Sequence, residues 1–368
     1  MSFGNSGLAG GAPPPVRTGD RRDREELSRT MTAHPAGHDP HPPSPEPPRT
    51  PTRPSAEPAA DTSTSPIVDA RTEPMWPVRG TAAGLTYVAL PPTAVDARAN
   101  GPTRLILSWP GFDPPRTAAA MATALPMTGV PTWRVFLDLP HQDDPAAALP
   151  TGLDSQGFLT HAGVTAFGTS VEKAAALLPA VLDDLGRDLG VPPGPVALAG
   201  FSVGAAVVLL TLAQQNVQVS TAALVAPVVS PARVAVSVEK RAGRERTWGP
   251  AADELAERLD LSAHAGLIAR SGAALLLIGG GRDRIVPPVE VTALRDLLTR
   301  CGAPAVEAAT FRMGHTLAAA PGTDARAPIT EAVRVDGVLT DWFRERLAEP
   351  TPAAAPPVSL HLTSSNSA

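Results

Sequence analysis

The stretch Val196-Ala-Leu-Ala-Gly-Phe-Ser-Val-Gly-Ala205 decides the fold of this chain. An apolar, strand-like segment runs into Gly200-Phe-Ser202-Val-Gly204 and then into an apolar, helix-compatible segment. The two glycines lack the Cβ atoms that would clash where a strand turns sharply into a helix. The stretch therefore predicts a tight strand–turn–helix unit with Ser202 at its tip, the geometry of a nucleophile elbow.

The same region raises the question of a membrane span, because residues 196–213 carry no charge. A helical span needs about 20 consecutive apolar residues. Here the Gly-x-Ser-x-Gly turn divides the run into a short strand and a helix, so we expect no membrane span.

The two ends of the chain differ in composition from its middle. Residues 1–72 are crowded with Pro, Arg, Asp, Ser and Thr, and residues 350–368 are rich in Ala, Pro and Ser. Segments without apolar periodicity cannot bury enough surface to offset the entropy lost on ordering. We therefore predict one α/β domain at 73–349 between two disordered tails.

Charge and cysteine content narrow the partners and the compartment. The formal net charge is −5, so no basic excess favours nucleic acid as a partner. Cys301 is the single cysteine, which excludes an intrachain disulfide. Arg21-Arg22 is followed by no apolar segment typical of an export signal, and we expect a cytoplasmic location.

Strand-like and helix-like segments alternate through the middle of the chain, which favours a mostly parallel sheet with helices on both faces. The expected strands are 84–90, 104–108, 132–137, 196–199, 222–226, 273–278 and 306–311. The expected helices are 116–125, 171–189, 203–214, 289–299 and 329–347.

Two later segments carry residues that an activated serine requires. In Leu275-Leu-Leu-Ile-Gly-Gly-Gly-Arg-Asp283, a buried strand ends in a turn that presents a carboxylate at the carboxyl edge of the sheet. In Phe311-Arg-Met-Gly-His315, a late strand is followed by a loop with a histidine. Histidine can take a proton from serine near neutral pH, and a carboxylate on its other nitrogen fixes its tautomer.

With the order Ser202, Asp283, His315, the chain resembles the α/β-hydrolase superfamily across nearly all of 73–349. The last two segments are similar to those of compact esterases and of dienelactone-hydrolase-like or peptidase-like members. The resemblance implies that Ser202 is the nucleophile, His315 the general base and acid, and Asp283 the orienting carboxylate.

The resemblance also implies an oxyanion hole, a pair of backbone N–H groups that bind the charge developing on the attacked carbonyl. Val203 would supply one N–H group from the start of its helix. The loop Trp109-Pro-Gly-Phe112-Asp113 resembles the family's His-Gly-x loop, with Phe112 at the donor position. Trp109-Pro110 replaces the usual histidine, so either Gly111 or Phe112 is the second donor.

Each candidate residue can also be interpreted as having a purely structural, non-catalytic role. Ser202 would be a turn serine, Asp283 a turn or helix N-cap carboxylate, and His315 a surface histidine. Asp138 and His141 follow a predicted strand, where a carboxylate usually caps a turn.

Other polar clusters point to no cofactor or metal. His34, His38 and His41 lie among prolines without regular ligand spacing. Gly279-Gly-Gly281 lacks the Lys-Ser/Thr of a phosphate loop and the spacing of a dinucleotide fingerprint. We therefore expect no cofactor.

Residues 227–272 form an insert long enough for a small lid above the serine. It contains a helix-like segment at 251–259 and a charged run at 239–246, which we interpret as solvated surface.

The sequence predicts a serine hydrolase that cleaves a carboxylic ester or a related acyl substrate through an acyl-serine. Thioesterase, peptidase and acyltransferase chemistry use the same residues. The alternative is a catalytically silent fold that binds a ligand or a protein. In either case the Pro-rich tail is a candidate docking segment for a protein partner.

Overall fold

The computed structural model describes residues 77–93, 99–140 and 154–348. The predicted tails at 1–72 and 350–368 lie outside these residues, as do the candidate histidines His34, His38, His41 and His141.

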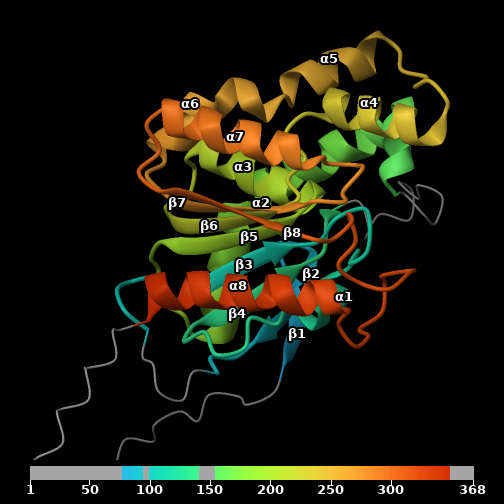
Figure 1. Cartoon of the computed structure of the whole chain (residues 1–368). Coiled ribbons are helices and arrows are strands. Elements are labelled where there is room, and N and C mark those ends of the chain that lie inside the picture. The colour runs from blue at the N-terminus through green and yellow to red at the C-terminus, as the bar shows by residue number, and fades with distance from the viewer. Residues whose placement is uncertain (1–76, 94–98, 141–153, 349–368) are drawn as a thin grey trace, which may run out of the picture. The chain divides into compact units, whose positions relative to one another are not determined.

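The described chain is organised around an eight-stranded sheet with the strand order β1-β2-β4-β3-β5-β6-β7-β8 (Figure 1). β2 pairs antiparallel with β1 and β4, and all other neighbours are parallel. The strands are β1 (Val78–Ala82), β2 (Leu85–Leu90), β3 (Leu105–Trp109), β4 (Trp133–Leu137), β5 (Val196–Phe201), β6 (Val219–Val225), β7 (Ala274–Gly280) and β8 (Val306–Phe311).

The central strands are buried on both faces. Every residue of β3, β4 and β5 is buried, and most of these residues are apolar. A strand covered on both sides reads as a continuous apolar run, which explains why the sequence predicted these strands well. β8, at the sheet edge, contains no fully buried residue.

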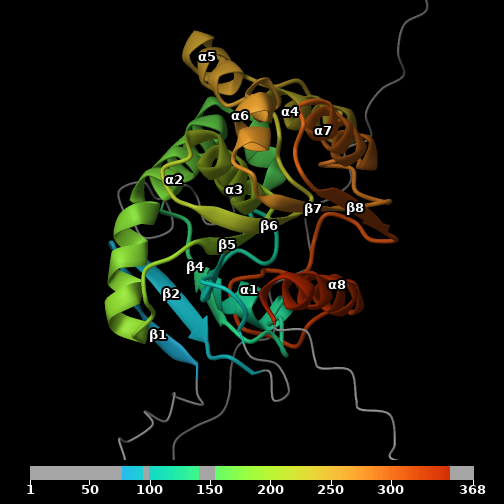
Figure 2. The same ribbon diagram turned by 90° about the vertical axis from the view of Figure 1, so that its left-hand side faces the viewer.

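Helices cover both faces of the sheet, as Figures 1 and 2 show. α2, α3, α6 and α7 lie on one face, with α4 and α5 beyond them, and α1 and α8 lie on the other. The α-helices are α1 (Ala118–Ala124), α2 (His161–Leu189), α3 (Val203–Gln214), α4 (Pro231–Ala242), α5 (Pro250–Arg258), α6 (Ala265–Arg270), α7 (Pro288–Arg300) and α8 (Thr330–Leu347).

The predicted fold class is confirmed, and two elements outside the insert differ from the expectation. β1 was not predicted, because its half-exposed residues and its central Gly80 give no apolar run. α2 begins at His161, ten residues earlier than expected. The uncharged run at 196–213 is β5 followed by α3, and within the described residues no helix is long and apolar enough to cross a membrane.

The insert 227–272 contains α4, α5 and α6, of which only α5 was expected. The charged residues 239–246, interpreted as surface, lie at the end of α4 and just after it. Because of these charges, the apolar face of α4 was not recognised in the sequence. Two hydrogen bonds join the insert to the short 3-10 helix η3 (Ser155–Leu159): Thr247 N donates to Leu159 O, and Trp248 Nε1 donates to Phe158 O.

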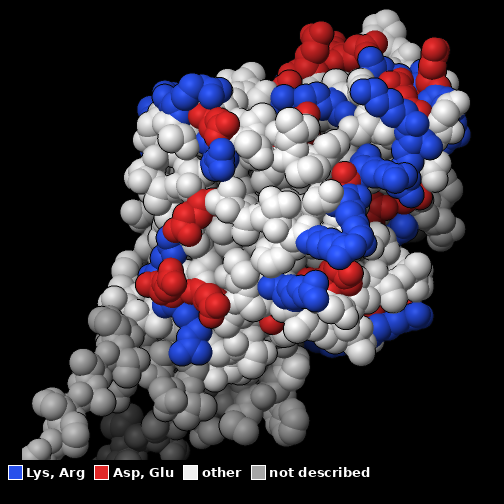
Figure 3. Space-filling view, in the orientation of Figure 1, with Lys and Arg blue, Asp and Glu red and all other residues white. Residues whose placement is uncertain are grey.

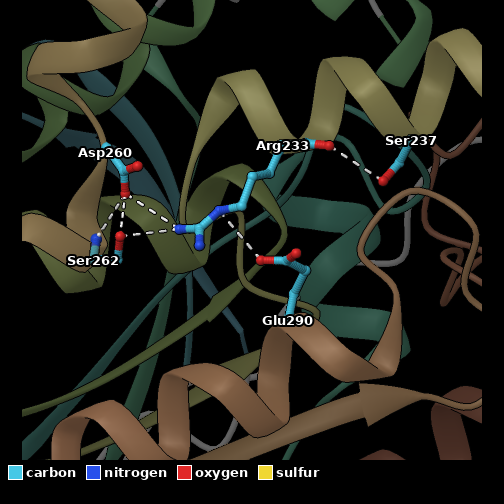
Figure 4. Close-up of polar contacts among 5 residues, drawn as sticks. All are labelled: Arg233, Ser237, Asp260, Ser262 and Glu290. Carbon is cyan, nitrogen blue, oxygen red and sulfur yellow. Dashed lines mark hydrogen bonds and ion pairs between the residues drawn. The ribbon is translucent and has the colours of Figure 1, made fainter.

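Arg233 of α4 contacts polar side chains of two neighbouring segments (Figure 4). Its guanidinium contacts Asp260 at 3.2 Å and the Ser262 hydroxyl at 3.1 Å, both at the start of a short 3-10 helix, η4 (Leu261–His264). On the other side, Nε lies 3.3 Å from the Glu290 carboxylate in the first turn of α7. One side chain therefore links the insert to the helix that follows the Asp283 loop.

Charged side chains cover the outer helices. On the face drawn in Figure 3, acidic and basic residues are interspersed over α4 and α5 and around α8. Exposed ion pairs such as Arg258–Glu172 belong to this layer. Such pairs typically contribute between 0 and about 1 kcal/mol, so we ascribe the stability of the fold to its apolar core.

Candidate active site

Ser202 occupies the turn between β5 and α3 in a backbone conformation that few side chains adopt. Its φ is 55° and its ψ is −111°. A positive φ on a residue other than glycine is uncommon and is held only where the surroundings impose it. Here Ser202 N donates to Val225 O at 2.9 Å, and Ser202 O accepts from Val228 N and Ala205 N. These bonds to the neighbouring strand end and helix fix the turn.

The glycines on either side of Ser202 are required by close backbone approach. A Cβ at Gly200 would lie 2.3 Å from Gly204 O, and a Cβ at Gly204 would lie 2.3 Å from Trp109 O. Neither neighbour is a flexible side chain, so no substitution fits without moving the backbone. The steric argument made from the sequence is therefore confirmed for both glycines.

The structure brings Ser202, His315 and Asp283 together in one hydrogen-bonded row. Ser202 Oγ lies 2.9 Å from His315 Nε2, and His315 Nδ1 lies 2.7 Å from Asp283 Oδ2. All three residues are buried. With the proton on Nδ1 donated to the carboxylate, Nε2 is left as the acceptor for the serine hydroxyl.

Asp283 also organises its own turn. Its Oδ1 accepts from Ile285 N at 2.8 Å and from Val286 N at 3.0 Å. The turn interpretation of Asp283 is thus correct, and it coexists with the contact to His315. The N-cap interpretation is wrong, because the N-cap of α7 is Pro287.

Backbone hydrogen bonds join the Asp283 loop to the His315 loop. Gly281 N donates to Phe311 O at 2.7 Å, and Arg282 N donates to Met313 O at 2.9 Å. The two loops follow the neighbouring parallel strands β7 and β8. Because these loops are bonded to each other, the histidine and its carboxylate are set by the backbone as well as by their own contact.

One of the two candidate oxyanion donors of the β3 loop has a partner within its own loop. Gly111 N donates to Pro115 O at 3.1 Å. Val203 is the first residue of α3, where the N–H groups have no partner one turn back in the helix. A Cβ at Gly111 would lie 2.9 Å from the Ser202 Cβ, which places this loop directly against the serine.

Charges around His315 favour its protonated form. Burial lowers the pKa of the imidazole, but the charge and hydrogen bond of Asp283, together with the charge of Asp113, outweigh it. Arg241 of α4 acts in the opposite sense. The net effect is a pKa raised above the ordinary value of 6.5.

Asp113 is the polar residue of the site that sequence reasoning missed. Its Oδ2 lies 3.8 Å from His315 Nε2, on the loop that carries Phe112. Burial raises the pKa of this carboxyl, while the charge of His315 opposes that shift. A carboxylate directly after a candidate oxyanion donor was the available signal in the sequence.

The two remaining candidate residues are Asp138 and His141. Asp138 Oδ1 accepts from Ala118 N at the start of α1, as expected for a capping carboxylate. His141 lies outside the described residues. Within residues 77–93, 99–140 and 154–348, no three His, Cys, Asp or Glu side chains are grouped so that they could hold a metal ion.

Comparisons with known proteins identify the fold. No family model matches the chain. No curated protein matches it either. Among solved structures, an acylaminoacyl peptidase of Pyrococcus horikoshii aligns with a TM-score of 0.50 and 12% identity, over 76% of this chain and 43% of that one. A puromycin-hydrolyzing peptidase of Mycobacterium tuberculosis aligns with a TM-score of 0.50 and 16% identity, over 73% of this chain and 40% of that one.

These likenesses and the strand order agree on one architecture. The chain has the fold of the α/β-hydrolase superfamily, as predicted. It spans less than half the length of these two peptidases, and at these identities the match describes the fold alone.

Proposed function

We propose that this chain is a serine hydrolase that cleaves a carboxylic ester or a related acyl substrate. The observation that carries the proposal is the row Ser202 Oγ, His315 Nε2, His315 Nδ1, Asp283 Oδ2, with contacts of 2.9 and 2.7 Å. A strained turn that displays a serine to a buried histidine–carboxylate pair has a direct chemical use in nucleophilic catalysis.

The first half of the reaction forms an acyl-enzyme. Ser202 Oγ attacks the substrate carbonyl carbon while its proton passes to His315 Nε2. Asp283 stabilises the imidazolium that results, because its carboxylate accepts from Nδ1. The bond to the leaving group then breaks, and the leaving group departs with the proton from Nε2. The products are an acyl-serine and a free alcohol.

The second half restores the enzyme. A water molecule gives a proton to His315 Nε2 and attacks the acyl carbon. The bond to Ser202 Oγ breaks, Oγ recovers the proton, and the acid is released. In both halves the negative charge on the carbonyl oxygen is stabilised by the N–H groups of Phe112 and Val203, a contribution typically of about a hundredfold or more per donor.

The rival proposal is a silent fold that binds a ligand or a protein. Three features argue for catalysis: the positive φ at Ser202, the glycines that permit it, and the second hydrogen bond of His315 to Asp283. A binding surface requires none of them. The aligned relatives are named for peptide and puromycin hydrolysis, which makes amides a second bond type to assay alongside esters.

The test is turnover of a matched ester and amide series by wild type, Ser202→Ala and His315→Ala. We expect a burst of about one leaving group per chain with an activated ester, followed by slower steady turnover as the acyl-serine hydrolyses. Both variants should lose the burst while keeping the wild-type thermal unfolding midpoint. Turnover that persists in Ser202→Ala would contradict the proposal.

A further inference from the structure

One partly buried carboxylate of the site, Asp113, has no role in the proposed mechanism. Asp113 follows Phe112 on the loop after β3, and its Oδ2 lies 3.8 Å from His315 Nε2. Its side chain is 14% exposed, against 5% for His315 and 0% for Asp283. Of the two carboxylates that flank the imidazole, Asp113 is therefore the one open to an incoming molecule.

Asp113 lies on the same side of the His315 ring as Ser202. His315 Nε2 is the nitrogen that faces Ser202 Oγ, whereas Asp283 contacts the opposite nitrogen. A carbonyl attacked by Oγ and bound by the Phe112 N–H group lies beside Nε2. Asp113 is the next residue after Phe112 and its Oδ2 lies 3.8 Å from the same Nε2, so its carboxylate would lie close to a substrate bound there.

A carboxylate at this position has an electrostatic cost. It lies near the point where the oxyanion develops, and like charges raise the barrier of the step that the oxyanion hole is built to ease. Among the charged neighbours, His315 and Arg116 favour its ionised form and Asp154 opposes it. A cationic group of the substrate would cancel this cost in the complex.

The carboxylate is held in place from the adjacent segment. The side chain of Ser155 in η3 favours the ionised form of Asp113 and so opposes the rise of its pKa that burial causes. The ring of Phe112 packs on Phe158 of the same short helix, with centroids 6.3 Å apart. These two interactions fix the loop, so the carboxylate is presented in one orientation.

We propose that Asp113 is a specificity-determining residue that binds an ammonium group on the carbon next to the scissile carbonyl. The preferred substrate is then an α-aminoacyl compound with a free amino group. The inference rests on the proposed hydrolase function and adds the substrate class to it.

A different role for Asp113 would be to act only through His315, by stabilising the imidazolium. The two roles predict different results. A carboxylate that acts on His315 alone changes the turnover of every substrate by the same factor. A carboxylate that also binds ammonium changes the ratio of turnover between cationic substrates and neutral substrates of the same shape.

The experiment compares alanine p-nitrophenyl ester with p-nitrophenyl isobutyrate, in which a methyl group replaces the ammonium. Rates are measured at about pH 7, where an α-amino group is largely protonated, and the rate with Ser202→Ala is subtracted. We expect wild type to prefer the alanine ester. In Asp113→Asn the ratio of the two kcat/KM values should fall about 10- to 100-fold, the range for loss of one hydrogen bond to a charged group. The fall should appear mainly as a higher KM for the alanine ester.

Glu345→Gln is the matched control, because it removes one negative charge from the exposed surface of α8 and should leave the ratio unchanged. An equal ratio in wild type and Asp113→Asn would overturn the inference. Labelling by a fluorophosphonate probe tests the hydrolase function separately from the substrate class. If wild type is labelled at Ser202 but shows no preference, only the substrate class is wrong. If it is neither labelled nor active, the hydrolase proposal fails and the inference fails with it.

Discussion

Gly204 packs against the backbone of Trp109 so closely that a Cβ at position 204 would lie 2.3 Å from the Trp109 carbonyl oxygen. The same Cβ would lie 2.6 Å from Pro110 O. The backbone at the start of α3 thus packs directly against the backbone of the loop after β3, with no side chain between them. These two segments carry Val203 and Phe112, so the contact sets the spacing of the proposed oxyanion donors.

This contact predicts that Gly204→Ala separates the two segments. We expect kcat for a neutral ester to fall at least about a hundredfold, the typical effect of losing one oxyanion donor, with a lower thermal unfolding midpoint. Gly337→Ala is the control, because nothing lies within 4 Å of a Cβ there and alanine is favoured over glycine inside a helix. It should leave kcat unchanged and raise the midpoint. Equal activity in the two variants would show that the spacing is unimportant.

Because the two oxygens of Asp283 have different partners, we predict that substitutions there affect kcat and stability separately. Asn at position 283 retains an oxygen for the N–H groups of Ile285 and Val286, but its amide nitrogen cannot accept from His315 Nδ1. We expect Asp283→Asn to lower kcat by about 10⁴-fold, as loss of the orienting carboxylate does in a serine protease, with little change in unfolding free energy.

Asp283→Ala removes the acceptors of both backbone bonds as well. It should therefore lower the unfolding free energy by about 1–3 kcal/mol beyond the effect of Asn, as expected for buried donors left unpaired. Urea unfolding of both variants measures the difference. Equal stability of the two variants would mean that the turn does not depend on Oδ1.

The raised pKa of His315 predicts the acid limb of the pH profile. Nε2 must be unprotonated to accept the Ser202 proton, so kcat/KM falls as pH drops through the pKa of the free enzyme. Asp283 and Asp113 raise this pKa against the opposing effects of burial and Arg241. The limb should therefore lie above pH 6.5 for a neutral ester.

Two substitutions should move that limb in opposite directions. Asp113→Asn removes a negative charge near the imidazole and should shift the limb to lower pH. Arg241→Gln removes a positive charge and should shift it to higher pH. Profiles of kcat/KM with p-nitrophenyl isobutyrate measure both shifts. Movement in the same direction would contradict the electrostatic account.

We predict that the unfolding free energy depends on the buried charge of Arg134. Its guanidinium donates to Pro91 O, Thr93 Oγ1, Met127 O and Val130 O, and burial lowers its pKa to about 10. Val130 O and Thr93 Oγ1 each have a second donor, whereas Arg134→Met removes the guanidinium from Pro91 O and Met127 O and should cost about 3 kcal/mol or more of unfolding free energy. Arg295→Met, at an exposed ion pair, should cost less than about 1 kcal/mol.

The central strands and the reacting residues could be predicted from sequence because their signals are local. Gly200 and Gly204 on either side of Ser202 indicate a turn too tight for a Cβ at those positions. Asp283 follows a continuous apolar strand. Parallel strands bring their carboxyl ends to one edge, and the order of the motifs resembles that of α/β-hydrolases. These two observations together led to the expectation that Ser202, Asp283 and His315 meet.

Features that depend on packing could not be predicted. β1 is recognisable only through its antiparallel pairing with β2. α4 shows its apolar face only when it is placed against η3, since its last turn is basic. Asp113 looks like an ordinary loop carboxylate until the fold sets it 3.8 Å from a histidine 202 positions later in the chain.

The central claim is that Ser202 is an activated nucleophile, and covalent labelling tests it most directly. We would incubate the purified full-length protein with a fluorophosphonate probe and locate the modified residue by mass spectrometry. The account predicts a single adduct on Ser202, formed in wild type and absent from folded Ser202→Ala and His315→Ala. A well-folded wild-type protein that acquires no adduct, or acquires it at another residue, would contradict the account.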